Sequence, residues 1–321
     1  MPERPLRRKL LRAAQAILLA AVIVFAGSKL VDEWGQVQNV ALGLTPRWSY
    51  VLASCLIVFA TYAVLIEVWR VLLTGWEARL RFGEAARIWT ISNLGRYVPG
   101  KVWQIGAMAV MAKQRGVSGI AAGGSAIVAT IITTLTGFAV VAIAGARTLR
   151  IPPLAVGLIL IAGLALLAAP IALPWLGPII SRVARRPVTV PRLPLSALLI
   201  TVFGSALAWC GYGVAFYVLA HGLLGDIPGS VPLYIAVFTG SYLIGFLTLI
   251  APGGLFVREV AMQTALQSAG FSAGSATVLV VASRLWLTVL EILPAVLFLL
   301  AQPVRWRSPD VSSTKPSDDR T

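Results

Sequence analysis

Two proline-glycine breaks interrupt apolar stretches of this chain and constrain its fold more than any other feature. They are Pro99-Gly100 and Pro252-Gly253-Gly254. A turn that opens a long hydrophobic run follows each break, at Gly116, 17 residues after Pro99, and at Gly270, 18 residues after Pro252. The similar spacing indicates an internal repeat. In membrane proteins with such interrupted segments in both halves, the substrate site typically lies where these segments meet.

The composition indicates a polytopic membrane protein, because 58% of the 321 residues are apolar and only 12% are charged. A net charge of +15 would favour a nucleic-acid partner in a soluble protein. Here most Lys and Arg flank apolar spans, where they set topology and contact anionic lipid heads, so we expect no nucleic-acid partner. Cys55 and Cys210 lie in predicted spans without metal-ligand spacing, and we expect no metal or other cofactor.

Six apolar stretches are long enough to cross a bilayer, which takes about 20 residues. The predicted spans are 13–31, 50–73, 120–146, 152–176, 195–220 and 272–301. The stretches 84–113 and 231–267 contain the breaks, and we interpret each as a re-entrant helical hairpin whose irregular backbone is covered by protein or a wet cavity. The predicted fold is an all-α polytopic membrane protein with about six transmembrane helices and two re-entrant helical hairpins in an inverted repeat.

The distribution of basic residues predicts the orientation of the chain. Basic clusters occupy the segments that this topology places inside, including residues 1–12, 79–87 and 182–192, as the positive-inside rule requires. Both termini are then cytoplasmic in a multi-pass protein of the cell membrane. The predicted organisation is a basic N-terminus (1–12), one transmembrane domain (13–307, with repeat halves at about 50–176 and 195–303) and a disordered tail (308–321).

Ionisable residues inside the apolar stretches are the first candidates for a functional site, because each costs about 2.5–3.5 kcal/mol at a helix centre unless it is paired or faces water. Arg96 and Lys101 flank the first break, and the helix restarting after Gly100 adds free N–H groups and a positive dipole end. These features predict an anion site. The alternative is a shallow hairpin whose cations extend to the cytoplasmic head groups. Trp103 and Gln104 are further candidate substrate contacts.

Four more charged residues follow the second break: Arg258, Glu259, Arg284 and Glu291. Adjacent Arg258 and Glu259 point about 100° apart on a helix, so they reach different neighbours. Arg284 and Glu291 share one face of the last span, about 10 Å apart along its axis. We predict a buried network in which Glu259 pairs with Arg284 and Glu291 with Arg258, or the reverse. Such a network either faces a substrate or only holds the hairpin against the bundle.

These motifs resemble the lysylphosphatidylglycerol synthase transmembrane-region family. The resemblance rests on residues 95–103 (GRYVPGKVW), on residues 251–254 (APGG) with Arg258 and Glu259, and on Arg284 with Glu291; it covers about residues 10–303. It implies a flippase-like membrane domain that moves a polar-headed lipid. In bifunctional members a soluble aminoacyl-transferase domain follows; the sequence stops at Thr321, so synthase activity is not implied.

Three classes of function are weighed. The favoured one is a flippase for an anionic or aminoacylated phospholipid or a polyprenyl-phosphate-linked lipid, with hopanoid-type lipids added by family analogy; cations bind the head while the tails stay in lipid. The alternative is a non-catalytic scaffold or accessory subunit of a cell-envelope lipid or glycan synthesis complex, partnered by its enzymes and with all polar residues satisfied. An enzyme is disfavoured because the spans hold few carboxylates and no His motif; Glu259 and Glu291 converging on Ser283 would favour it.

Overall fold

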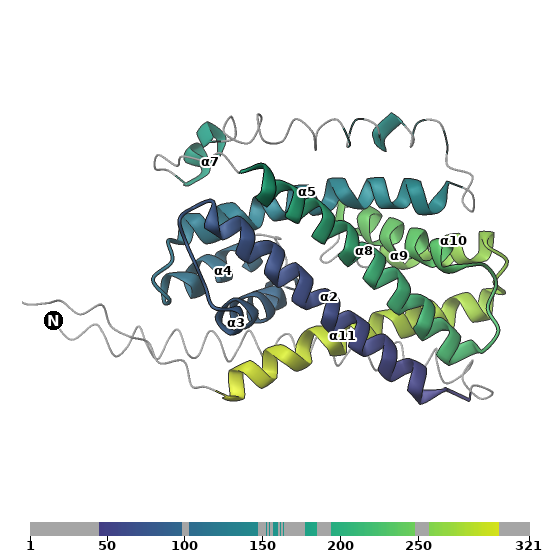
Figure 1. Ribbon diagram of the computed structural model, residues 1–321. Coiled ribbons are helices and arrows are strands. Elements are labelled where there is room, and N and C mark those ends of the chain that lie inside the picture. The colour runs from purple at the N-terminus through teal and green to yellow at the C-terminus, as the bar shows by residue number, and fades with distance from the viewer. Residues whose placement is uncertain are drawn as a thin grey trace, which may run out of the picture.

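The computed structural model describes residues 45–97, 103–146, 177–184, 194–247 and 257–301, together with a few positions between 152 and 163. This part of the chain is helical and contains no strand (Figure 1). Both proline-glycine breaks, Lys101, the predicted span 13–31, most of 152–176 and the terminal segments 1–12 and 308–321 lie outside the described residues. The helices are α2 (Trp48–Thr74), α3 (Phe82–Asn93), the 3-10 helix η1 (Leu94–Tyr97), α4 (Trp103–Lys113), α5 (Gly119–Gly145), α7 (Gly177–Ala184), α8 (Leu195–Leu224), α9 (Val231–Leu247), α10 (Val257–Ser268) and α11 (Ala273–Ala301).

Helices α2, α5, α8 and α11 are long and apolar enough to cross a membrane. They contain 27 to 30 residues, which at 1.5 Å per residue gives about 40–45 Å, more than the roughly 30 Å of a hydrocarbon core. At most 39% of the most apolar window of each helix is buried inside the protein. Large apolar side chains such as Ile143, 81% exposed, face outward. An outward apolar surface on four long helices is that of a multi-pass membrane protein.

Helices α2 and α8 pack against each other in opposite directions. Glycines of α8 face successive residues of α2: Gly204 faces Val68, Gly211 faces Thr61 and Gly222 faces Tyr50. Small residues let the two backbones approach closely, which is the usual basis of helix packing in a bilayer. The C-terminal ends of α2 and α8 therefore lie at opposite ends of the bundle.

The first hairpin consists of α3 with η1 as one arm and α4 as the other. At its open end Arg115, just after α4, pairs with Glu84 in the first turn of α3, with 3.1 Å between Nη1 and Oε1. Near the closed end Gln104 donates a hydrogen bond to the side chain of Asn93. The chain therefore returns to the end where it began. With 11 residues, α4 is about 16 Å long and too short to cross a bilayer.

The second hairpin consists of α9 and α10. Its open end brings Tyr234 and Phe271 together, with ring centroids 6.2 Å apart, and near its closed end Gly245 lies against Arg258. These arms have 17 and 12 residues; α10 is too short to span a bilayer, and α9 lies at the lower limit of about 17 residues. That either hairpin lies in the membrane and re-enters from one side stays a prediction.

The two hairpins open at opposite ends of the bundle. The first follows α2, and Arg70 of α2 donates to the Leu80 carbonyl at the start of that hairpin, over 3.0 Å. The second begins at Val231, shortly after the C-terminus of α8. Because α2 and α8 are antiparallel, α3 and α4 lie at one end and α9 and α10 at the other (Figure 1). An inverted repeat requires this arrangement.

The same turn ends both hairpins. Gly116 and Gly270 have positive φ angles of 80° and 98°, a conformation that costs glycine little. The next amide in each turn bonds to a carbonyl five residues back, Val117 to Ala112 and Phe271 to Leu266, both over 3.1 Å. This bond is characteristic of a Schellman cap. The turns that first indicated a repeat in the sequence therefore share one local structure.

Two apolar cores hold the hairpins in place. One packs the first hairpin against α2 and α5, with Trp69 and Met108 among its buried side chains. The other packs the second hairpin against α2, α8 and α11, with Phe238 and Met262 in its interior. Helix α5 contacts α4 and α9, and α11 contacts α3 and α10, so each of these two helices touches both hairpins. The space enclosed between them contains the candidate site.

Candidate functional site

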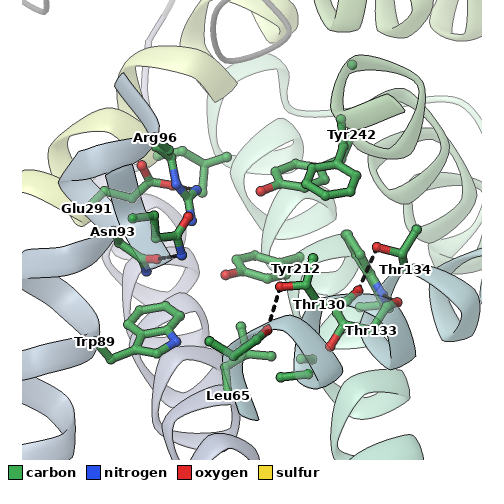
Figure 2. Close-up of a pocket in the computed structure, with 18 of the residues that line it drawn as sticks. Leu65, Trp89, Asn93, Arg96, Thr130, Thr133, Thr134, Tyr212, Tyr242 and Glu291 are labelled. Atoms are coloured by element: carbon green, nitrogen blue, oxygen red, sulfur yellow. Dashed lines mark hydrogen bonds and ion pairs between the residues drawn. The ribbon is translucent and has the colours of Figure 1, made fainter. Parts of the chain in front are cut away.

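A cavity of about 450 Å³ lies at the centre of the bundle. Its lining residues come from both hairpins and from α2, α5, α8 and α11. Pockets of about 300–1,000 Å³ accommodate small ligands, so this one is large enough for a lipid head group. Figure 2 shows a charged wall formed by Arg96 and Glu291, a facing wall formed by Thr130, Thr133 and Thr134, and the rings of Tyr212 and Tyr242 between them.

Glu291 of α11 is held by the first hairpin. Arg96 of η1 places Nη1 2.6 Å from Glu291 Oε1, and the hydroxyl of Tyr97 donates to Glu291 Oε2 over 2.7 Å. The predicted pairing of Glu291 with Arg258 is therefore wrong. The sequence predicts that Arg96 binds an anion together with Lys101. In the structure Arg96 lies in the 3-10 helix after α3, and its side chain pairs with Glu291, a carboxylate of α11.

Arg284 of α11 pairs with Glu259 of α10, as in one of the two predicted arrangements. The distance between Arg284 Nη1 and Glu259 Oε1 is 3.4 Å, and both side chains are largely shielded from solvent. The second carboxylate oxygen, Glu259 Oε2, is buried without a hydrogen-bond partner among the described residues. Two ion pairs on α11 thus hold one arm of each hairpin.

Arg258, the second residue of α10, differs from the other two arginines of the cavity. Its exposed fraction is 6%, and it lines the cavity. Its guanidinium carbon lies 5.3 Å from the ring centre of Phe238 and 5.7 Å from that of Tyr242, both on α9. Within the described part of the chain no carboxylate is within ion-pair distance of Arg258, and Nη2 has no hydrogen-bond partner.

The remaining candidates near the first break have different positions. Gln104 lines the cavity and donates to Asn93, which also lines it. Trp103 is 57% exposed and is not among the cavity-lining residues. Lys101 and the break itself, Pro99-Gly100, lie outside the described residues, as do Pro252, Gly253 and Gly254. The structure therefore joins Gln104, Arg96, Arg258, Arg284 and Glu291 around one cavity, with Glu259 behind Arg284.

Sequence reasoning missed the polar wall on α5. Thr130, Thr133 and Thr134 line the cavity, and Thr133 also shares a 2.9 Å hydrogen bond with Ser205 of α8. The i, i+3, i+4 spacing of hydroxyls in an apolar span places them on one helix face and was a readable signal. The turns of the two repeats, at Gly116 and Gly270, are 154 residues apart. With this offset between the repeats, Thr130 of the first corresponds to Arg284 of the second, and Thr134 corresponds to Thr288. Both partners line the same cavity.

Three polar residues outside the ion pairs of the cavity have local partners. Arg70 pairs with Glu67 within α2. The ring of His221 stacks with Tyr217, with centroids 6.2 Å apart, and packs against Tyr50. Ser283 donates to the Val280 carbonyl over 2.8 Å and does not join the two carboxylates.

Comparison with known proteins agrees with the motifs. Residues 12–295 match the model of the family described as the lysylphosphatidylglycerol synthase TM region. The match covers most of the chain, including both hairpins, α2, α5, α8 and most of α11, and confirms the resemblance. No curated protein matches the chain at a significant level.

Proposed function

We propose that this chain, which belongs to the lysylphosphatidylglycerol synthase transmembrane-region family, is a flippase that moves a polar-headed lipid between the leaflets of the cell membrane. The proposal is supported above all by the central cavity, which both hairpins and all four long helices line. Moving a charged or zwitterionic head group into hydrocarbon is unfavourable by several kcal/mol, and a cavity lined by arginine, tyrosine and threonine lowers this free energy. The lipid is an anionic or aminoacylated phospholipid or a polyprenyl-phosphate-linked lipid.

The two hairpins give the cavity a symmetric relation to the two leaflets. The first opens at the end of the bundle where α2 ends, and the second opens at the other end, where α8 ends. In transporters built from inverted repeats, movement of one repeat against the other exposes a central site to each side in turn. In this chain such movement would present the head group to one leaflet and then the other, while the tails stay in lipid.

The positive-inside rule assigns the sides. Basic residues at the open end of the first hairpin include Arg79, Arg81, Lys113 and Arg115. The opposite end carries Arg47, whose amide bonds to the carbonyl of Gly222 near the end of α8, and Asp226 follows that helix. Short cytoplasmic loops are enriched in Lys and Arg. We therefore place the opening of the first hairpin and both termini in the cytoplasm, and the opening of the second hairpin outside.

Unsatisfied polar atoms at the site favour a flippase over a scaffold. A scaffold would be expected to satisfy every polar group in its interior, because each unpaired one is costly in a bilayer. Here Nη2 of Arg258, a cation that lines the cavity, is buried without a partner among the described residues, whereas the other such atoms belong to residues outside the cavity lining. A cation of this kind is expected where an anionic ligand supplies the missing contacts.

Transbilayer movement of fluorescent or mass-resolved lipids, polyprenyl phosphate included, tests the proposal in proteoliposomes. The wild-type protein is compared with Arg96→Ala, Lys101→Ala and Arg258→Ala, each shown to be folded by size-exclusion chromatography. Head-group-selective movement that these variants lose supports the flippase. If well-folded wild-type protein moves no lipid, the proposal fails and the charges are architectural.

A further inference from the structure

We infer that Arg258 is the residue that binds the lipid head, and that the head it accepts is a phosphodiester without an amine. This inference rests on the proposed function and narrows its substrate class. Three arginines line the cavity, and the two carboxylates paired with them are Glu259 and Glu291. Among the described residues, these three arginines exceed the two carboxylates by one positive charge. Arg258 is the arginine without a carboxylate partner, so the excess charge lies there.

Arg96 and Arg284 are poor receptors because each is already engaged. Arg96 gives Nη1 to Glu291, and Arg284 gives Nη1 to Glu259. A ligand anion at either arginine would lie beside a carboxylate that already balances its charge, or would displace that carboxylate and leave it buried and unpaired, and both are unfavourable. Arg258 carries no such penalty.

Arg258 is held in place by apolar contacts that leave hydrogen-bonding capacity free. Phe238 and Tyr242 lie 5.3 and 5.7 Å from its guanidinium carbon, distances at which a cation is attracted to a ring face. Ring faces do not replace hydrogen-bond acceptors, and Nη2 has none among the described residues. A buried cation with unmade hydrogen bonds gains most from an anionic ligand.

The chemistry of Arg258 selects phosphate over other anionic groups of lipids. A guanidinium presents donors in a planar fork that matches two oxygens of one phosphate. Its position in the first turn of α10 adds the positive end of the helix dipole. One phosphodiester carries one negative charge, which equals the single excess positive charge of the three cavity arginines and the two carboxylates paired with them.

An amine on the head group would meet an unfavourable environment. Among the described residues, the charged groups that line the cavity apart from Arg258 are Arg96, Arg284 and Glu291, and both oxygens of Glu291 already accept hydrogen bonds. An aminoacylated head would bring at least one ammonium among these guanidiniums. We therefore expect lipids with a net charge of −1 to bind better than zwitterionic lipids, and cationic aminoacylated lipids to bind worst.

The test compares lipids with identical fluorescent tails and different heads: phosphatidylglycerol, phosphatidylcholine and lysyl-phosphatidylglycerol. Transbilayer movement is measured in proteoliposomes of the full chain for the wild type, Arg258→Gln, Arg258→Lys and the control Arg115→Gln. Arg115 pairs with Glu84 at the surface, outside the cavity. We expect the wild type to move phosphatidylglycerol fastest and Arg258→Gln to lower that rate about tenfold, the effect of losing a charge-assisted contact. Arg258→Lys should keep part of the preference, and Arg115→Gln all of it.

Binding to the same proteins in detergent, followed by native mass spectrometry, separates the inference from the proposed function. If the wild type moves no lipid but binds phosphatidylglycerol, and Arg258→Gln loses this binding, the proposed flippase activity is wrong and the inferred head-group site is supported. If the wild type moves or binds lipids and folded Arg258→Gln keeps the wild-type head-group order, the inference is overturned. Glycerophosphoglycerol, which is the same head group without tails, tests whether the ligand is a lipid or a soluble phosphodiester. If it displaces phosphatidylglycerol at equal concentration, the inference that the ligand is a lipid is overturned.

Discussion

Arg96 and Glu291 are separated by 195 residues in the chain, yet Nη1 of the arginine lies 2.6 Å from Oε1 of the glutamate. Their contact joins the first hairpin to the last membrane span. Tyr97 donates to the other carboxylate oxygen over 2.7 Å, so two consecutive residues of η1 hold one carboxylate. The pair therefore couples the two halves of the chain, and Arg258 is left as the cation available to a ligand.

Glu291→Gln should destabilise the protein, because it removes the charge that compensates Arg96. We expect a loss of about 1–2 kcal/mol, the range for polar contacts between membrane helices. Thermal unfolding in detergent, monitored by size-exclusion chromatography, measures it. The double variant Arg96→Gln with Glu291→Gln should be more stable than the sum of the single variants predicts. Strictly additive losses would show that the two residues are not coupled.

The predicted helix boundaries agree closely with the structure where the chain is described. The predicted span 272–301 corresponds to Ala273–Ala301, and the predicted hairpin segment 84–113 corresponds to α3 through α4 (82–113). Apolar runs that end at turn residues fix such boundaries locally. The repeat could also be predicted from the sequence, because the positive φ angle of each Schellman turn is a local requirement that glycine meets.

The contacts between helices were less predictable. Glu259 and Arg284 lie in consecutive helices, and their pairing was one of the two arrangements that the sequence left open. Neither arrangement gave Arg96 as the partner of Glu291, because helical periodicity relates residues within one helix and not the rotation of that helix against a distant one. The fact that Thr130 faces the charged wall depends on the same long-range packing, although the hydroxyl spacing itself was visible.

Gly95→Ala should destabilise the first hairpin. A Cβ at Gly95 would lie 2.6 Å from the backbone nitrogen of Gln104, and backbone cannot move aside as a side-chain tip can. Overpacking of this kind costs about 1–3 kcal/mol. The measurement is the midpoint of thermal unfolding.

Gly106→Ala is the matched control, because this residue of α4 belongs to the same hairpin and has nothing within 4 Å of an added Cβ. Alanine is favoured over glycine inside a helix by up to about 1 kcal/mol. The two variants should therefore shift the midpoint in opposite directions. Equal shifts would argue against close contact of the hairpin arms.

The proposed orientation predicts which turns face the cytoplasm. In a background with Cys55 and Cys210 changed to Ala, single cysteines are introduced as Gln114→Cys and Asp226→Cys, both at exposed positions at opposite ends of the bundle. A membrane-impermeant maleimide should label residue 226 in intact cells and residue 114 only after permeabilisation. Labelling of both in intact cells would contradict an inverted arrangement, and the reverse pattern would invert the assigned sides.

The threonine wall should contribute to lipid movement and little to stability. Thr134 donates to the Thr130 carbonyl over 2.8 Å, within its own helix, so Thr134→Val removes a local bond and keeps the shape of the side chain. Thr264→Val is the matched control: Thr264 makes the same bond to Val260, over 2.9 Å, on the exposed face of α10 and outside the cavity. Both changes should leave the unfolding midpoint nearly unchanged. Thr134→Val alone should slow lipid movement by roughly 2–10-fold, the effect of losing one neutral hydrogen bond to the head group. Equal rates for the two variants would show that the head group passes without touching this wall.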